Sequence, residues 1–259
     1  MKNRKRRKAQ EKRQNLVNSG PPRDQQGRFW LYGTHAVAAA LANPERDKYR
    51  LAATSVDHGL SADGLEIEIM ERHDLEKLLP LGAVHQGMAL LVSPLRETSL
   101  NQILAGSSDE SKIVVLDQVT DPQNIGAVLR SAAAFGADAV IATDRHTPYT
   151  TGALAKAASG ALEWVPFIRV INLARTLEEL KAADYWCAGL AADGNETLTE
   201  AKLTGRTVLV IGAEGTGLRR LTRNSCDFLV RIPIQGNVNS LNLSAATAIS
   251  LYELTRNSI

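Results

Sequence analysis

The chain has 259 residues, of which 44% are hydrophobic, with 30 lysines and arginines against 28 aspartates and glutamates, and two cysteines. No apolar run approaches the roughly 18 residues that a membrane span requires, and Cys187 and Cys226 stand alone, without a CxxC pair or a Cys/His cluster. We therefore expect a soluble protein of one or two domains in a reducing, cytoplasmic compartment, with no disulfide scaffold and no thiolate metal site.

The net charge of +2 hides a strongly basic N-terminus. Residues 1–28 hold ten basic and two acidic side chains, a local charge of +8, which leaves −6 on residues 29–259. This tail buries too little apolar surface to offset the entropy of ordering it, so we expect it to be disordered. It is typical of an arm that binds a polyanion, nucleic acid first, with a solubilising extension or an organelle transit peptide as alternatives.

The next part of the chain has the pattern of a small α/β domain over residues 29–95, followed by a polar linker over 96–111. Gly106 to Glu110 is the most linker-like part of that stretch. In chain order, the segment 29–32 leads into Gly33, and the pattern then predicts a helix over 36–43, an apolar segment over 51–56, a helical stretch near 61–79 and a buried strand over 87–92.

Residues 112–259 alternate between apolar strands and helices, and we treat them as a second domain. Such alternation predicts a mostly parallel sheet with helices on both faces. The predicted strands are 113–117, 139–144, 207–212 and 228–234, and the predicted helices are 124–136, 153–159 and 244–256. Ligand sites in such sheets gather where strands end at their carboxyl side, and three of these ends carry unusual residues.

The first such strand end is followed by DPQNIGAVLRSAAAFGAD, residues 121–138. Asp121 suits the N-cap and Pro122 the first helical position. The apolar face of the helix contains Ile125, Val128, Leu129 and Ala132, so helical periodicity places Arg130 nearly opposite that face and Asn124 on its flank. Arg130 is therefore either a solvated surface arginine or a guanidinium for a phosphate or a reacting hydroxyl.

The second strand end is followed by GAEGTGLRR, residues 212–220. Its glycines, Gly212, Gly215 and Gly217, let backbone N–H groups approach a ligand closely. The GxxGxG spacing differs from the dinucleotide-binding GxGxxG, and no Lys-Ser/Thr follows, so a Rossmann-type nucleotide enzyme is disfavoured. Glu214 is either a helix N-terminal acid or a site carboxylate.

The third strand end is followed by a polar loop over residues 235–242, rich in side-chain donors and acceptors. A helix cap explains one serine, Ser240 or Ser244, and leaves the three asparagines of the loop unexplained.

Together these segments resemble the SpoU/TrmH family of RNA ribose 2′-O-methyltransferases, within the knotted SPOUT superfamily. The resemblance lies in DPQNIGAVLRSAAAFGAD, VLVIGAEGTGLRR and IPIQGNVNSLNLSAATAISLYE, in the family's order, and covers essentially all of residues 112–259. YGTHAVAAAL (32–41) and HQGMALLV (85–92) are similar to the ends of the small L30e-like substrate-binding domain of the RlmB-like branch.

The resemblance implies a fold, a cofactor and a set of site residues. The fold is a methyltransferase domain with a C-terminal trefoil knot, which binds S-adenosylmethionine in its knotted loops. The cofactor would be bound, mostly through backbone groups, by Gly212, Ile232, Leu241, Gly217 and Gln235. The catalytic residues would be Arg130, Asn124, Glu214, Ser240 and Asn242.

The resemblance also implies a homodimer whose site is completed across the interface, and a reaction without a metal. It leaves Arg130 with two possible roles, as the base or as an electrostatic helper. We expect the substrate to be a guanosine of 23S rRNA, because the tRNA branch usually lacks the small N-terminal domain. A tRNA ribose 2′-O-methyltransferase and a non-catalytic RNA-binding protein of ribosome assembly are the alternatives.

Overall fold

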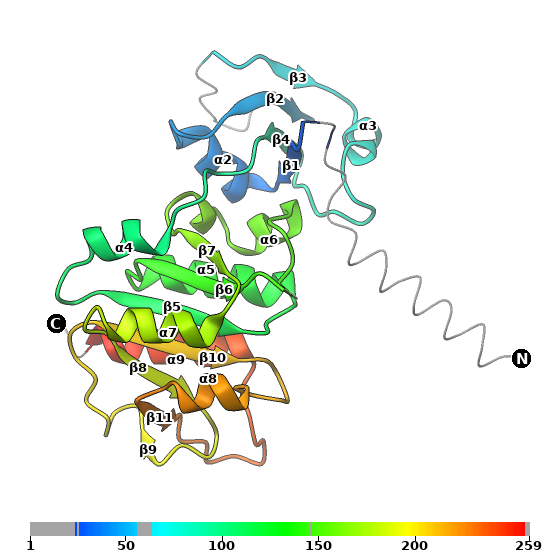
Figure 1. Cartoon of the computed structure of the whole chain (residues 1–259). Helices are drawn as coiled ribbons and strands as arrows, with labels where there is room; N and C mark the ends of the chain where they lie inside the picture. The colour runs from blue at the N-terminus through cyan, green and yellow to red at the C-terminus, as the bar shows by residue number, and fades with distance from the viewer. Residues whose placement is uncertain (1–23, 25, 56–63, 146, 257–259) are drawn as a thin grey trace, which may run out of the picture. The chain divides into compact units, whose positions relative to one another are not determined.

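The computed structural model describes residue 24 and residues 26–55, 64–145 and 147–256. Most of the predicted disordered tail, residues 1–23 and 25, lies outside the described residues. The chain forms two compact units, shown in Figure 1. The first contains residues up to Leu95 together with Pro148–Lys156, and the second contains Arg96–Thr147 and Ala157–Ile259.

The first unit is built on a four-stranded sheet with the order β1-β4-β2-β3. Strand β4 is antiparallel to β1 and β2, whereas β2 and β3 are parallel. Leu90 of β4 lies opposite both Leu31 and Leu51, and all three are buried in the core. The elements are β1 (Phe29–Tyr32), α2 (Thr34–Ala42), β2 (Lys48–Ala53), β3 (Ile67–Ile69), α3 (Arg72–Lys77), β4 (Met88–Val92) and, from later in the chain, α6 (Gly152–Ala157).

Two predictions for this region need correction. The helix expected near 61–79 is wrong for most of its described length, because Ile67–Ile69 is strand β3 and only Arg72–Lys77 is helical. Ile67-Glu68-Ile69 alternates with the period of a strand and pairs with the free edge of β2, where Leu51 lies opposite Ile67. The helix predicted over 153–159 exists as α6 but groups with the first unit, where Gly152 approaches the backbone of β1 so closely that a side chain would not fit.

The second unit confirms the predicted α/β fold with a parallel sheet. Its seven strands have the order β7-β6-β5-β10-β8-β11-β9, and every pairing is parallel. The strands are β5 (Lys112–Asp117), β6 (Ala139–Thr143), β7 (Phe167–Val170), β8 (Trp186–Leu190), β9 (Glu196–Thr197), β10 (Thr207–Gly212) and β11 (Phe228–Arg231).

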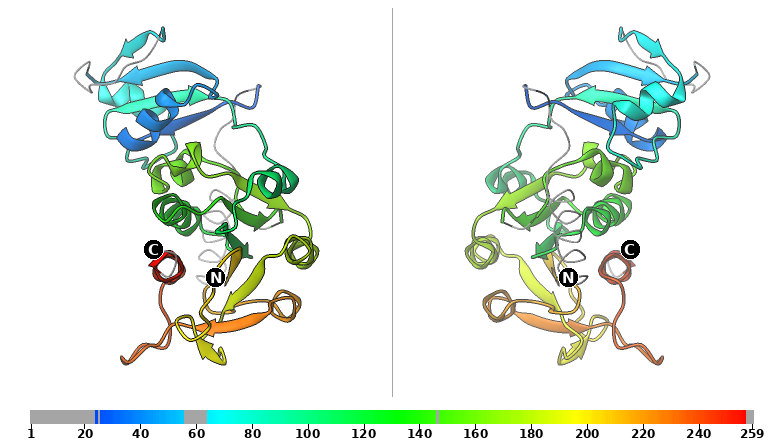
Figure 2. Two further views of the ribbon diagram at one scale, coloured as in Figure 1. Left: turned by 90° about the vertical axis from the view of Figure 1, so that its left-hand side faces the viewer. Right: turned by 90° about the vertical axis from the view of Figure 1, so that its right-hand side faces the viewer.

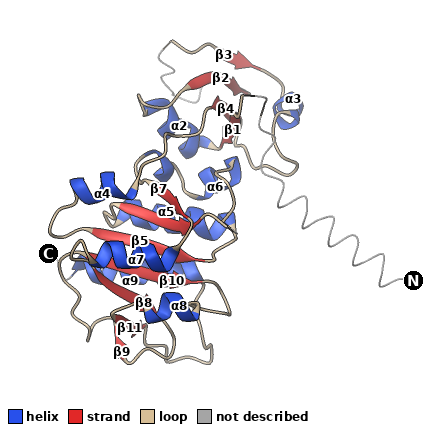
Figure 3. Ribbon diagram, viewed as in Figure 1, coloured by secondary structure: helices blue, strands red, loops and turns tan. Residues whose placement is uncertain are grey.

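Helices cover both faces of this sheet, as Figures 2 and 3 show. Helices α5 and α9 pack together on one face, and α7 and α8 lie on the other. The helices are α4 (Leu100–Gly106), α5 (Pro122–Ala134), the 3₁₀ turn η1 (Ala161–Glu163), α7 (Leu173–Lys181), α8 (Arg220–Asn224) and α9 (Leu243–Arg256). Strand β11 ends at Arg231, three residues earlier than predicted, so the loop between β11 and α9 begins at Ile232.

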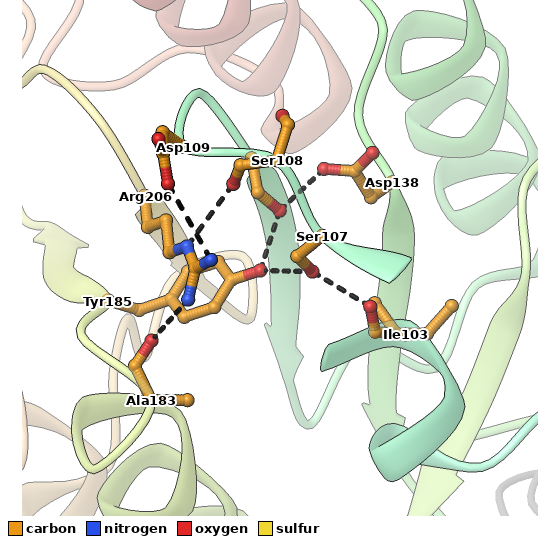
Figure 4. A network of polar contacts seen from close by, with 9 residues as sticks. Ile103, Ser107, Ser108, Asp109, Asp138, Ala183, Tyr185 and Arg206 are labelled. Carbon is orange, nitrogen blue, oxygen red and sulfur yellow. Dashed lines mark hydrogen bonds and ion pairs between the residues drawn. The ribbon is translucent and has the colours of Figure 1, made fainter. Parts of the chain in front are cut away.

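The stretch predicted as a linker, residues 96–111, contains helix α4, so that prediction is wrong for Leu100–Gly106. Ser99 and Gln102 form a reciprocal capping box at its start, and Leu100, Ile103 and Leu104 pack against the core of the second unit. Figure 4 shows the hydrogen bonds around Tyr185 that hold the segment after α4. The hydroxyl of buried Tyr185 lies 2.7 Å from Oγ of Ser107 and 2.6 Å from Oγ of Ser111.

Candidate active site

The three predicted strand ends bring three polar side chains together. Asn124 follows β5, Glu214 follows β10 and Asn242 follows β11. Oε1 of Glu214 accepts a hydrogen bond from Nδ2 of Asn242 at 2.9 Å and another from Nδ2 of Asn124 at 3.2 Å. Nδ2 of Asn242 also lies 3.1 Å from Oδ1 of Asn124. The carboxyl ends of β5, β10 and β11 are therefore linked through one cluster of side chains.

Helix caps place two members of this cluster. Oδ1 of Asp121 accepts from the backbone N–H of Gln123 at 3.0 Å, with Pro122 in the first position of α5, as predicted. Asn124 thereby lies in the first turn of the helix. At α9, Oδ1 of Asn242 accepts from the backbone N–H of Ser244 at 2.9 Å. The same amide thus caps α9 with its oxygen and binds Glu214 with its nitrogen.

The capping role of Asn242 corrects the expectation that Ser240 or Ser244 caps this helix. Helix α9 begins at Leu243, so Asn242 occupies the position before the first helical residue. Ser244 lies inside the helix, and its hydroxyl donates to Oδ1 of Asn242 at 2.5 Å. This arrangement accounts for one of the three asparagines that the serine caps left unexplained.

The glycine-rich loop after β10 turns back on itself. Gly217 donates its N–H to the carbonyl of Ala213 at 2.9 Å, and Gly215 and Gly217 have φ of 79° and 66°, values that favour glycine. A Cβ at Gly212 would lie 2.1 Å from the backbone carbon of Gly217. The space that a side chain needs at Gly212 is therefore filled by the loop's own backbone.

The remaining predicted residues lie on the loop after β11 or on α5. Ile232 is half-buried, whereas Gln235, Ser240 and Leu241 are exposed. Arg130 is exposed on α5, as its helical position predicted, and no hydrogen bond or ion pair of the described residues involves it. It follows Asn124 by six residues, about 9 Å along the helix axis. Within one chain, neither Arg130 nor Ser240 joins the Asn124–Glu214–Asn242 cluster.

Sequence analysis did not select Asp117, the last residue of β5. Its carboxylate is buried, and Oδ1 lies 2.6 Å from Nε of Arg219 while Oδ2 accepts the backbone N–H of Arg219 at 3.0 Å. The sequence feature that could have identified it is an acidic residue at the end of an otherwise apolar strand, IVVLD. Strand ends of this kind lie at the edge of the sheet where ligands bind.

The two thiols are unsuited to nucleophilic chemistry. Burial raises the pKa of Cys187 to about 12, and burial likewise raises the pKa of Cys226 to about 12. Among the described residues, no group of three or more His, Cys, Asp or Glu side chains could hold a metal ion. No helix in the described part of the chain is long and apolar enough to cross a membrane.

Comparison with known proteins decides the family. The model of the SpoU rRNA Methylase family matches residues 111–252, more than half of the chain. The chain belongs to the SpoU rRNA methylase family. The model described as RNA 2′-O ribose methyltransferase substrate binding matches residues 30–98 of this SpoU-family protein.

Relatives match the SpoU-family protein over nearly their whole length. It is 43% identical over 240 residues to the 23S rRNA (guanosine-2′-O-)-methyltransferase RlmB of Escherichia coli strain K12, an alignment that covers 87% of this chain and 97% of RlmB. The crystal structure of an RNA 2′-O ribose methyltransferase has a TM-score of 0.76 at 25% identity and covers 94% of this chain and 93% of that chain.

A third relative has the same fold at lower identity. The SpoU methyltransferase AviRb of Streptomyces viridochromogenes, solved in complex with the cofactor AdoMet, has a TM-score of 0.76 at 24% identity. The alignment covers 91% of this chain and 92% of AviRb.

Replacing Gly212 by alanine tests the close approach within the glycine-rich loop. Because the new methyl group would overlap the backbone of Gly217, the loop must move away from β10. We expect the free energy of unfolding to fall by about 1–3 kcal/mol, the usual cost of overpacking. Urea denaturation measures this loss. Gly106→Ala is the control, since nothing lies within 4 Å of its Cβ position and its φ, like that of Gly212, is not positive. Equal stability of G212A and the wild-type protein would contradict the close approach.

Proposed function

We propose that this protein transfers the methyl group of S-adenosylmethionine to the ribose 2′-hydroxyl of a guanosine in 23S rRNA. The observation that carries the proposal is the Asn124–Glu214–Asn242 cluster, which joins three strand ends at the ligand-binding edge of the sheet. The relatives that match nearly end to end at 43% identity are named for this reaction. The matched substrate-binding region supports ribosomal RNA over tRNA as the substrate.

The residues at this edge fit an amphipathic, cationic cofactor. The loop after β11 exposes three apolar side chains, Ile234, Val238 and Leu241. Glu214, which binds Asn242 at the end of this loop, adds an exposed carboxylate. We propose that Gly212, Gly217, Ile232, Gln235 and Leu241 hold S-adenosylmethionine, which supplies an electrophilic methyl group on a sulfonium. A 2′-hydroxyl is required by this reaction, which distinguishes RNA from DNA.

The protein's own residues then position and activate the ribose oxygen. Transfer needs in-line placement and an oxygen that loses its proton as the new bond forms. Asn124, Asn242 and Ser240 are polar groups that orient the substrate, and Glu214 keeps the loops together. We propose that Arg130 stabilises the developing negative charge on the oxygen and a neighbouring phosphate, because a guanidinium that keeps its proton is a poor base.

We propose a homodimer that completes the site, supported by the outer surface of the α5–α9 layer. Ile249 and Tyr252 on α9 are 44% and 55% exposed. The ring of Tyr252 also packs edge-on against Phe135, with centroids 6.2 Å apart. These apolar groups lie in the same helical layer as Arg130, which has no hydrogen-bond or ion-pair partner among the described residues. A partner subunit that covers this layer would bury the apolar groups and bring Arg130 to a reaction centre.

A trefoil knot at the C-terminal end is also part of the proposal. After β11, near one edge of the sheet, the chain returns through residues 232–242 so that α9 packs against α5 and the central strand β10. Such a return path supports the knotted loops that the family resemblance implies. We place the protein in the cytoplasm because ribosomal RNA is the proposed substrate.

The test is methyl transfer from isotopically labelled S-adenosylmethionine to 23S rRNA and, separately, to a tRNA pool. Nuclease mapping locates the product, and the same RNA with a 2′-deoxy nucleotide at the mapped position is the control. We expect label on one guanosine of 23S rRNA and none on the deoxy control. Label on tRNA alone would favour the tRNA alternative, and RNA binding without transfer would favour the assembly protein.

A further inference from the structure

The loop that carries Glu214 is fixed at both ends by neighbouring strands. At its start, Gly212 is the last residue of β10 and lies opposite Asp117 of β5. At its far end, the side chain of Leu218 packs against the core, beside Gly189 of β8. Arg219 follows at once and is bound by Asp117. One buried carboxylate therefore lies beside the start of the loop and binds its end.

The environment of Asp117 explains why this contact is specific. The side chain of Asp117 is 0% exposed, and a buried carboxylate is stable only when its oxygens are bound. Both of its oxygens accept hydrogen bonds from one residue, Arg219: Oδ2 from the backbone N–H and Oδ1 from Nε–H. The side chain of Arg219, in contrast, is 45% exposed. The partners are 102 residues apart in sequence.

We infer that Asp117 is a positioning residue, which fixes the glycine-rich loop and thereby sets Glu214 for cofactor binding. The inference rests on the proposed function. Between the two anchored ends, the loop forms a tight turn with the Gly217–Ala213 hydrogen bond and positive φ at Gly215 and Gly217. Glu214 lies in this turn and accepts from Asn242 and Asn124. Release of Arg219 lets the turn move away from both asparagines.

Three substitutions separate the parts of this contact. Asp117→Asn keeps the shape but replaces one acceptor with an amide that faces an N–H donor. Arg219→Ala removes the side-chain bond and keeps the backbone bond to Asp117. Arg219→Lys keeps a cation that can reach the carboxylate. The matched control is Asp138→Asn, because Asp138 binds Lys112 N and Ser111 Oγ at the opposite end of β5.

The first readout is the affinity for S-adenosylmethionine, measured by calorimetry with the full-length protein. For D117N we expect a Kd about tenfold higher, the loss that follows removal of one hydrogen bond to a charged group. We expect KM for the cofactor to rise in parallel, with kcat at saturation much less affected. R219A should raise Kd less than D117N does, and R219K should bind the cofactor more tightly than R219A. D138N should leave Kd unchanged.

The second readout needs no cofactor. Hydrogen exchange of the amides of residues 213–219 should be faster in D117N than in the wild-type protein and unchanged in D138N. Wild-type cofactor affinity together with unchanged hydrogen exchange in D117N would overturn the inference. An equal loss of cofactor affinity in D117N and D138N would also overturn it. If the wild-type protein itself does not bind S-adenosylmethionine, the proposed function fails, while the exchange experiment still tests the contact between Asp117 and the loop.

Discussion

Replacing Arg130 by alanine should lower the rate of methyl transfer by about a thousandfold, the scale expected when a group that stabilises transition-state charge is removed. Cofactor affinity should stay close to that of the wild-type protein, because Arg130 is exposed on α5 and makes no described contact with the loops after β10 and β11. Single-turnover rates at saturating S-adenosylmethionine measure the first quantity, and calorimetry measures the second.

The control for Arg130 is Arg175→Ala. Arg175 is also an exposed helical arginine, on α7, and its Nε donates to Glu179 at 3.0 Å. This exposed pair contributes little to stability, so R175A should keep wild-type turnover. Near-wild-type turnover of R130A would remove Arg130 from the mechanism.

Mixing subunits tests whether Arg130 acts in its own site or in the partner's. Alone, R130A should keep about a thousandth and N242A about a hundredth of wild-type activity. If Arg130 completes the partner's site, a mixed dimer has one site with both residues intact, and random mixing restores about a quarter of wild-type activity. No recovery after mixing would place Arg130 in its own subunit's site, contrary to the proposed dimer.

The second large effect is expected at Asn242, which has two separable roles. Asn242→Ala removes both the cap of α9 and the hydrogen bond to Glu214. Transfer should fall by about a hundredfold, and the free energy of unfolding should fall by about 1 kcal/mol through loss of the cap. Asn242→Asp keeps an oxygen that caps the helix but places a second carboxylate against Glu214. It should lose transfer as N242A does, with less loss of helix stability.

Asn172→Ala is the matched control for the cap. Oδ1 of Asn172 accepts from the backbone N–H of Arg175 at 3.2 Å and caps α7, a helix on the other face of the sheet from α9. N172A should lose about 1 kcal/mol of stability and keep its activity. Denaturant titration and the methyl-transfer assay together separate the two roles. Full activity in N242D would show that the contact with Glu214 is dispensable.

Much of the second unit could be predicted because its signals are local. Asp121 and Pro122 mark the start of α5, and the spacing of Ile125, Val128 and Leu129 defines its buried face. The buried runs of β5, β6 and β10 are continuous and largely apolar, as is typical of parallel strands covered on both faces.

Other elements could not be predicted from the local sequence pattern. Ile67–Ile69 becomes a strand because β2 offers it an edge, and α4 is stable because Leu100, Ile103 and Leu104 find a core to cover. Residues 160–206, to which sequence analysis assigned no element, hold η1, β7, α7, β8 and β9. Propensity is a weak guide where tertiary contacts supply most of the stabilisation.

By itself, the sequence determined the α/β class, the three strand ends that carry polar residues, and the outward direction of Arg130, because each follows from short-range periodicity and capping. Only the tertiary structure decided that Asn242 caps α9 while binding Glu214, and that Asp117 holds Arg219. Those contacts join residues 28 and 102 positions apart. Hydrogen bonds over such separations depend on how strands are ordered in the sheet, which no local pattern encodes.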